Sequence, residues 1–195
     1  MDVRKIIMLG IFLWILSPLY GQEIIQLAPV SQVGLKANLV SYATTTLSIG
    51  AEVKLAPRYT IDLPLTYNPW SFTEEKKMKH ILFQPELRYW LCESFHGAFA
   101  GLHVHGGYYN VGGMGLSDYM KAHRFEGWLA GFGVSYGYQW ILSERLSLEA
   151  TFGLGYAYMD YEIFPCEKCG QKIKDKTTNY FGPTRAGISL IYILK

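Results

Sequence analysis

The sequence predicts an all-β protein, an eight-stranded antiparallel up-and-down transmembrane β-barrel preceded by a signal peptide. Three observations predict it. Eight segments alternate apolar and polar residues with a period of two, which is typical of strands with one apolar face. Beyond the N-terminus, no apolar run approaches the roughly 20 residues of a membrane-spanning helix. The chain is rich in Tyr (15), Phe (10) and Gly (20) but has only 3 Cys, which suits alternating strands better than a helical bundle.

The clearest alternation lies in residues 126–140, EGWLAGFGVSYGYQW. Its even positions are apolar or aromatic from Trp128 to Trp140, and its odd positions, apart from Leu129, are small or polar. At about 3.3 Å per residue and a tilt of about 45°, that distance projects to roughly 28 Å. This is close to the apolar band of about 25 Å between the aromatic girdles of outer-membrane barrels. The stretch therefore predicts a strand with lipid on its even side.

The chain divides into a targeting segment and one domain. Arg4 and Lys5 precede an apolar run and then Gly21 at a plausible cleavage site, so residues 1–21 are expected to be a signal peptide. A short membrane anchor is the alternative, although the run is too brief to span a bilayer. Residues 22–32 are expected to be a periplasmic lead-in, and residues 33–195 the barrel.

The expected strands follow one another with connections of alternating length. Pro64 and Pro85 should mark a bulge, a rim position or a local irregularity, because proline cannot donate to a ladder. Short turns belong on the periplasmic side and long loops outside, with both chain ends inside. The strands are expected at residues 33–39, 47–55, 58–67, 81–91, 98–107, 126–140, 146–158 and 185–194, with turns at 44–46, 56–58, 92–95 and 142–145 and long polar loops at 68–79, 109–124 and 160–179.

The two faces of the predicted strands assign each side chain either to the lumen or to the outer surface of the barrel. The polar face is expected to form a lumen network, which must be mutually paired if it is closed from water; this makes interior packing a better interpretation than a selectivity filter. A soluble β-sandwich or lipocalin-like barrel is the alternative, with the apolar side inward. The lumen network comprises Lys36, Glu52, Lys54, Asp62, Glu86, Arg88, His103, His105, Glu149 and Arg185, and the aromatic girdle comprises Tyr59, Tyr67, Tyr89, Trp128, Tyr136, Tyr138, Trp140, Tyr156, Tyr158 and Tyr192.

Several strings of the sequence identify a family resemblance. Besides residues 126–140, they are YNPW (67–70), QPELRYWLCESFHG (84–97), GLHVHGG (101–107), CEKCG (166–170) and NYFGPT (179–184). Together they resemble an uncharacterised outer-membrane β-barrel family of Bacteroidota, classed as a domain of unknown function. The resemblance covers nearly all of the mature chain. It implies a small outer-membrane barrel, supplies no catalytic residues, and suggests fimbrial or adhesin proteins as partners.

Two pairs of residues could carry chemistry. Cys166 and Cys169, spaced C-x-x-C in the last long loop, could form a disulfide outside the cell, take part in a zinc site, or stay as free thiols. Cys92 is expected at the opposite end of the barrel, out of reach of both. His103 and His105 share a face with Glu86, so a proton relay or metal cluster is one interpretation, and a hydrogen-bonded pair in a packed interior is the other.

Three functions are compatible with this sequence. The favoured one is a non-enzymatic barrel of the cell outer membrane, which contacts lipid and presents its loops for adhesion, fimbria-type assembly or envelope integrity. The second is a barrel enzyme that modifies outer-leaflet lipid, with His80 and His123 near the outer rim. The third is a narrow passive pore, which eight strands leave little room for. We expect no cofactor and no metal, and the net charge of +2 gives no reason to expect a nucleic-acid partner.

Overall fold

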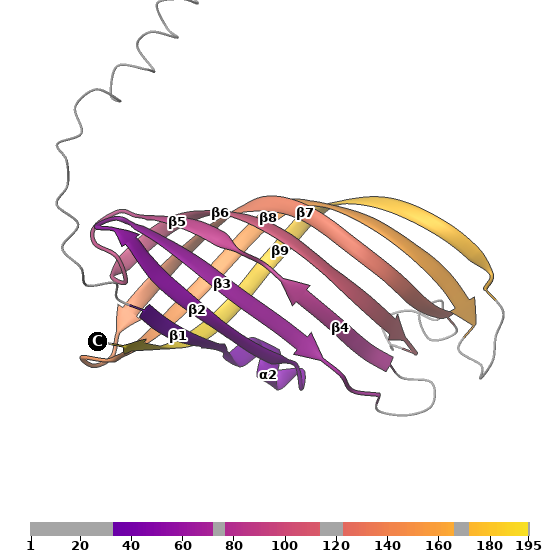
Figure 1. Cartoon of the computed structure of the whole chain (residues 1–195), viewed down its shortest axis with the longest axis horizontal. Coiled ribbons are helices and arrows are strands. Elements are labelled where there is room, and N and C mark those ends of the chain that lie inside the picture. Colours follow the sequence, from indigo (N-terminus) through magenta and orange to yellow (C-terminus); the bar gives the residue numbers. More distant parts are fainter. Residues whose placement is uncertain (1–32, 72–76, 114–122, 166–171, 195) are drawn as a thin grey trace, which may run out of the picture. The chain divides into compact units, whose positions relative to one another are not determined.

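The protein folds as one antiparallel sheet that closes on itself (Figure 1). The structure is a computed structural model, and it describes residues 33–71, 77–113, 123–165 and 172–194. The predicted signal peptide (residues 1–21) and lead-in (residues 22–32) lie outside the described residues. The strands are β1 (Val33–Asn38), β2 (Leu47–Ala56), β3 (Tyr59–Asn68), β4 (Lys77–Phe83), β5 (Glu86–Trp90), β6 (Gly97–Gly112), β7 (His123–Ile141), β8 (Leu146–Pro165) and β9 (Lys174–Leu194).

Closure comes from β1, which pairs with β2 on one side and β9 on the other. The strands β4 and β5 both pair with β3 and with β6, so they form two halves of one strand in the wall. The described strands therefore make a closed eight-stranded antiparallel barrel, and the predicted fold class is confirmed.

The interruption between β4 and β5 lies at Gln84 and Pro85. Pro64 of β3 faces the same gap, and its carbonyl accepts a hydrogen bond from the Gln84 amide at 3.2 Å. Neither proline has an N–H for the ladder, so the pairing of β3 passes from one half-strand to the other at this point. The irregularity expected at these two prolines is thus a single break within the wall.

The first connection differs from the expected turn at residues 44–46. A short helix, α2 (Leu39–Ala43), follows β1, and the Asn38 side chain caps it by accepting a hydrogen bond from the Val40 amide at 3.1 Å. The strand predicted to include Leu39 therefore ends one residue earlier. No helix within the described ranges is long and apolar enough to cross a membrane.

The predicted long loops are also much shorter than expected. Of the residues predicted to be loop, 77–79 belong to β4, 109–112 to β6, 123–124 to β7, 160–165 to β8 and 174–179 to β9. These residues mix polar and apolar side chains, and they keep the cross-strand partners that extend the ladder, for example Glu126 with Glu162 and Tyr161 with Lys176. The sequence concealed these extensions, because their polar and apolar residues do not alternate cleanly.

The barrel has two different ends. At the first, which we call the turn end, lie the short connections after β2, β5 and β7 together with the start of β1 and the end of β9. At the second, which we call the mouth, β4, β6, β7, β8 and β9 reach furthest (Figure 1). Charged side chains lie inside the wall, where Glu86 is 1% and Arg88 0% exposed, whereas apolar side chains such as Phe132, at 62%, cover the outer surface.

Candidate functional site

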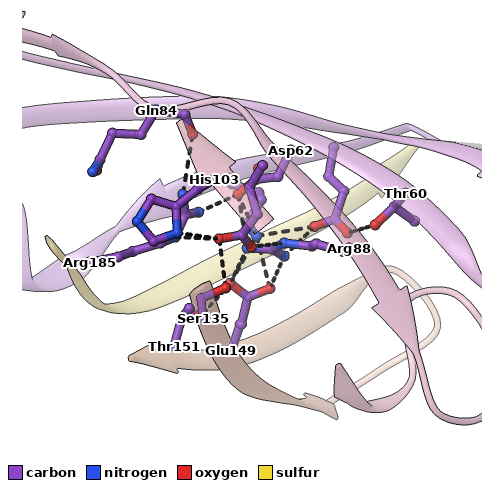
Figure 2. Close-up of polar contacts among 12 residues, drawn as sticks. Thr60, Asp62, Gln84, Arg88, His103, Ser135, Glu149, Thr151 and Arg185 are labelled. Atoms are coloured by element: carbon purple, nitrogen blue, oxygen red, sulfur yellow. Dashed lines mark hydrogen bonds and ion pairs between the residues drawn. The ribbon is translucent and has the colours of Figure 1, made fainter. Parts of the chain in front are cut away.

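The lumen near the turn end holds a cluster of ion pairs centred on Arg88 (Figure 2). Its guanidinium donates from Nε to Glu86 Oε1 at 2.6 Å and from Nη2 to Asp62 Oδ2 at 2.9 Å. From Nη1 it donates to Glu52 Oε2 at 2.8 Å and to Glu149 Oε2 at 2.7 Å. One planar group therefore binds four carboxylates from four different strands, which fits the forked geometry of arginine.

Two further cations complete this ion cluster. Lys36 Nζ lies 2.8 Å from Glu149 Oε2 and 3.1 Å from Glu52 Oε2. Arg185 Nη2 lies 2.6 Å from Asp62 Oδ2, and its Nε lies 3.3 Å from Glu86 Oε2. The ion cluster thus places three cations against four carboxylates. Taking each ion out of water costs several kcal/mol, so such a group persists only because every member is paired.

Hydroxyl groups donate further hydrogen bonds to three of the four carboxylates. Thr60 donates to Glu52 Oε1 at 2.5 Å, Ser135 to Glu86 Oε2 at 2.8 Å and Thr151 to Glu149 Oε1 at 2.8 Å. Among the described residues, Asp62 Oδ1 is the one carboxylate oxygen of the ion cluster that is buried without a hydrogen bond. The cluster is therefore a nearly complete network, which favours a rigid plug over a mobile lining.

Strand register explains why these residues meet. Glu52 lies opposite Asp62, and Asp62 lies opposite Glu86 on the next strand, so three carboxylates share one level of the wall. Gly101 leaves the room they need, because a Cβ there would lie 2.7 Å from the Glu86 carboxyl carbon. The small residues on the lumen side of β6 and β7 therefore make space for long side chains from their neighbours.

An aromatic layer lies on the turn-end side of the ion cluster. Trp90 packs on Phe99 with ring centroids 4.8 Å apart and on Phe95 at 6.2 Å, and Ile191 joins them; all four are buried. The Arg88 guanidinium stacks 4.2 Å from the centre of the Phe99 ring, which joins the two layers. The sequence pattern placed Phe99 inside but did not identify this layer, for which the signal is large apolar residues on the otherwise polar lumen face.

The two predicted histidines lie on the mouth side of the ion cluster. Their ring centroids are 5.7 Å apart, and His103 Nε2 lies 2.9 Å from Thr184 Oγ1. His103 Nδ1 lies 3.8 Å from Glu86 Oε2, and neither Nδ1 has a hydrogen-bond partner. Within the described ranges, no group of three His, Cys, Asp or Glu residues is placed to hold a metal ion. The arrangement fits a packed pair better than a metal cluster.

The other predicted residues have separate places. Lys54 lies on the lumen face opposite Thr60 but makes no ion pair with the cluster. Cys166 and Cys169 lie outside the described residues, and Cys92 is a free, exposed thiol at the turn end.

The girdle residues lie on the outer surface, several in ring contacts. The contacts are Tyr59 with Tyr89, Tyr138 with Trp140, Trp128 with Tyr158, and Tyr156 with Phe132. Tyr67, Tyr136 and Tyr192 are exposed there too.

The mouth contains a cavity that the sequence pattern missed. Its volume is about 940 Å³, and it is open to solvent. Alternation places Tyr109 of β6 and Tyr161 of β8 on its lumen side, with Asn68 of β3 and His80 of β4. The signal was present in the sequence, because the period of two that puts His105 inside continues to Tyr109.

Charged groups at the mouth are paired with one another. Lys172 Nζ lies 2.6 Å from Glu162 Oε1 and also contacts Asp175, and hydrogen bonds to these two carboxylates raise the pKa of Lys172. Glu126 accepts a hydrogen bond from Asn110 at 2.9 Å and lies 3.6 Å from Arg124 Nη2. These exposed pairs add little stability, but they leave the mouth with few unpaired charges.

Comparison with known proteins identifies the family. The model of a family described as "Protein of unknown function (DUF3575)" matches residues 8–194. The chain belongs to this family. No curated protein and no solved structure gives a significant match. Family membership therefore agrees with the predicted family of unknown function and assigns no activity.

Proposed function

We propose that this barrel spans the outer membrane and presents its mouth at the cell surface as a non-enzymatic binding scaffold. Support comes first from the outer wall, where large apolar side chains are exposed on several consecutive strands. Leu102 is 64% exposed, and its neighbours around the wall, Val134 and Leu154, are exposed too. A contiguous apolar surface of this kind marks contact with lipid or protein, and a closed barrel leaves no unpaired edge along its closed portion for lipid to meet.

The orientation follows from the two ends. Short connections and both ends of the described chain gather at the turn end, which in outer-membrane barrels faces the periplasm. The mouth, with the longest strands, then faces outward. The strand ends at the mouth, among them the end of β8 and the start of β9, then face partners outside the cell.

The observation that carries the proposal is a plugged lumen beneath an open mouth. The ion cluster and the aromatic layer place buried side chains across the lumen, which supports a barrel closed to solutes. The mouth, in contrast, holds a cavity of about 940 Å³. A barrel that is closed to transport and open only at one end is suited to binding at the surface, as in adhesion, fimbria-type assembly or envelope integrity.

Orientation can be tested by labelling intact cells. In a background with Cys92, Cys166 and Cys169 replaced by serine, we expect Ile173→Cys, at the mouth, to react with a membrane-impermeant maleimide. We expect Glu144→Cys, at the turn end, to react only after lysis. Both positions are exposed, so burial does not distinguish them. Labelling of Glu144→Cys but not of Ile173→Cys on intact cells would overturn the proposed orientation.

Closure and binding need two further measurements. The purified protein should give no steady conductance in a planar bilayer, and stable open channels would contradict a plugged lumen.

Replacing residues 166–171 by a glycine-serine linker of equal length should abolish capture of surface partners while the heat-shifted band of the folded barrel on a gel is retained. Unchanged capture would show that this connection does not bind the partner.

A further inference from the structure

The mouth cavity has the size and position of a ligand site. Ligand pockets commonly occupy about 300–1,000 Å³ and occur at the mouths of β-barrels, and this cavity measures about 940 Å³. Its lining comes from β3, β4, β6, β7, β8 and β9, so it spans the barrel instead of lying in one groove. A ligand seated there would contact most of the wall at once.

Glycine on β7 helps to create this cavity. Gly127 lies opposite Tyr109 on one side and Tyr161 on the other. A Cβ at Gly127 would lie 2.6 Å from the Tyr161 Cβ, so the two strands approach too closely there for any larger residue. The two tyrosine rings are therefore held on either side of a position that has no side chain of its own.

Several polar groups of the lining have donors or acceptors that are not used in hydrogen bonds. Among the residues that the structure describes, the Tyr109 hydroxyl makes no hydrogen bond and Asn110 Oδ1 is buried without a partner. His80 and the Tyr161 hydroxyl add groups that can both donate and accept, and Tyr161 uses one such bond, at 3.3 Å, to Thr178. Buried polar groups without partners are costly, so a ligand that satisfies them gains from it.

The charged groups of the lining do not favour binding of a charged ligand. Lys172 is paired with Glu162 and Asp175, and Glu126 with Arg124 and Asn110. The other charged residues of the lining, Lys79 and Asp160, have opposite signs. A neutral ligand therefore leaves these pairs intact, whereas an ion would have to compete with them.

From these features we propose that the mouth binds a neutral saccharide. A sugar ring presents C–H groups that pack on aromatic faces and hydroxyls that donate and accept, and Tyr109, Tyr161 and His80 offer both kinds of contact. A lipid chain would leave the polar groups unpaired. The inference rests on the proposed function, because it makes the mouth the surface-exposed recognition site, and it names the ligand class.

The test uses the purified, folded mature chain in detergent with three neutral trisaccharides as probes: maltotriose, raffinose and chitotriose. Isothermal titration should show saturable binding of at least one probe at millimolar concentration or below. Tyr109→Phe keeps the ring and removes one hydroxyl, so it should weaken that binding about two- to tenfold. Tyr161→Ala, which also removes a ring, should weaken it further.

Tyr138→Phe is the matched control, because it removes the same hydroxyl from an exposed tyrosine near the turn end. It should bind the probe like the unchanged protein, and the heat-shifted band of each variant confirms folding. Absence of binding by all three probes, or equal binding by the Tyr109→Phe, Tyr161→Ala and unchanged proteins, would overturn the saccharide site. The labelling and conductance experiments test the proposed function independently. If the barrel is oriented and plugged as proposed but binds none of the probes, only the saccharide site is wrong.

Discussion

The two halves of the lumen share the strands β3, β6, β7, β8 and β9 but are built in opposite ways. Toward the turn end, four carboxylates, three cations and an aromatic layer occupy the interior. Toward the mouth, the same alternation places tyrosines, histidine and asparagine around an open cavity. The difference lies in which side chains face glycine. Gly137 faces the Phe99 ring and Gly133 faces His103, so large side chains lie over these two glycines, whereas the nearest atoms at Gly127 belong to the backbone of β8 and the Tyr161 Cβ.

Closing the barrel and shaping its mouth are therefore separate structural tasks. The ion cluster determines whether solutes pass, and it is remote from solvent. The mouth has few buried contacts, so its residues can change with less cost to stability. Substitutions near the turn end should therefore change the free energy of unfolding more than substitutions at the mouth.

Arg88→Ala should be the most damaging change, because it leaves four carboxylates without their central partner. Breaking a buried ion pair costs about 3–5 kcal/mol, so we expect the free energy of unfolding in urea to fall by at least this amount. Arg145→Ala, at an exposed turn, should change it by less than about 0.5 kcal/mol. Equal stability of the two variants would mean that the ion cluster does not hold the lower half together.

Phe132→Arg tests the outer wall at mid-height. If Phe132 faces hydrocarbon, the charge should reduce the free energy of folding into bilayers by about 2–4 kcal/mol, whereas Tyr138→Arg, nearer the edge of the apolar band, should cost about 0–1 kcal/mol. Folding titrations in lipid vesicles measure both. A protein whose outer wall faced water would tolerate the two changes alike.

Gly133→Ala tests whether small residues on β7 make room for the lumen side chains. The new methyl group would lie 2.5 Å from the Leu154 carbonyl oxygen and 2.7 Å from His103 Nε2. We expect a loss of about 1–3 kcal/mol in unfolding free energy. Gly106→Ala, where the nearest atom is 3.8 Å away, is the matched control and should be nearly neutral. A neutral Gly133→Ala would show that the wall can relax.

Tyr161→Phe should have the smallest effect on stability. It removes one hydrogen bond of 3.3 Å to Thr178 at the partly exposed mouth. We expect a change in unfolding free energy within about 0.5 kcal/mol. A loss as large as that of Gly133→Ala would contradict the description of the mouth as loosely built.

The sequence predicted the barrel because alternation is a local signal, repeated eight times. It also placed Glu52, Asp62, Glu86, Arg88 and Glu149 on one face, but not their pairing, because contacts between distant strands depend on register. The polar strand ends at the mouth were mistaken for loops, since residues such as Lys174 and Asp175 carry no alternation of hydrophobicity. The aromatic layer went unnoticed because the pattern placed Phe99 on the lumen face but did not bring Trp90 and Ile191 to it from other strands.

The central claim is that the outer wall meets hydrocarbon while the lumen is closed to it. Trp140 is exposed on that wall, and Trp90 is buried in the aromatic layer. Two variants, each keeping one of these as the only tryptophan, can be folded into vesicles of lipids brominated on their acyl chains. We predict strong fluorescence quenching of Trp140 and little of Trp90. Equal quenching of both, or an unquenched Trp140, would contradict the account.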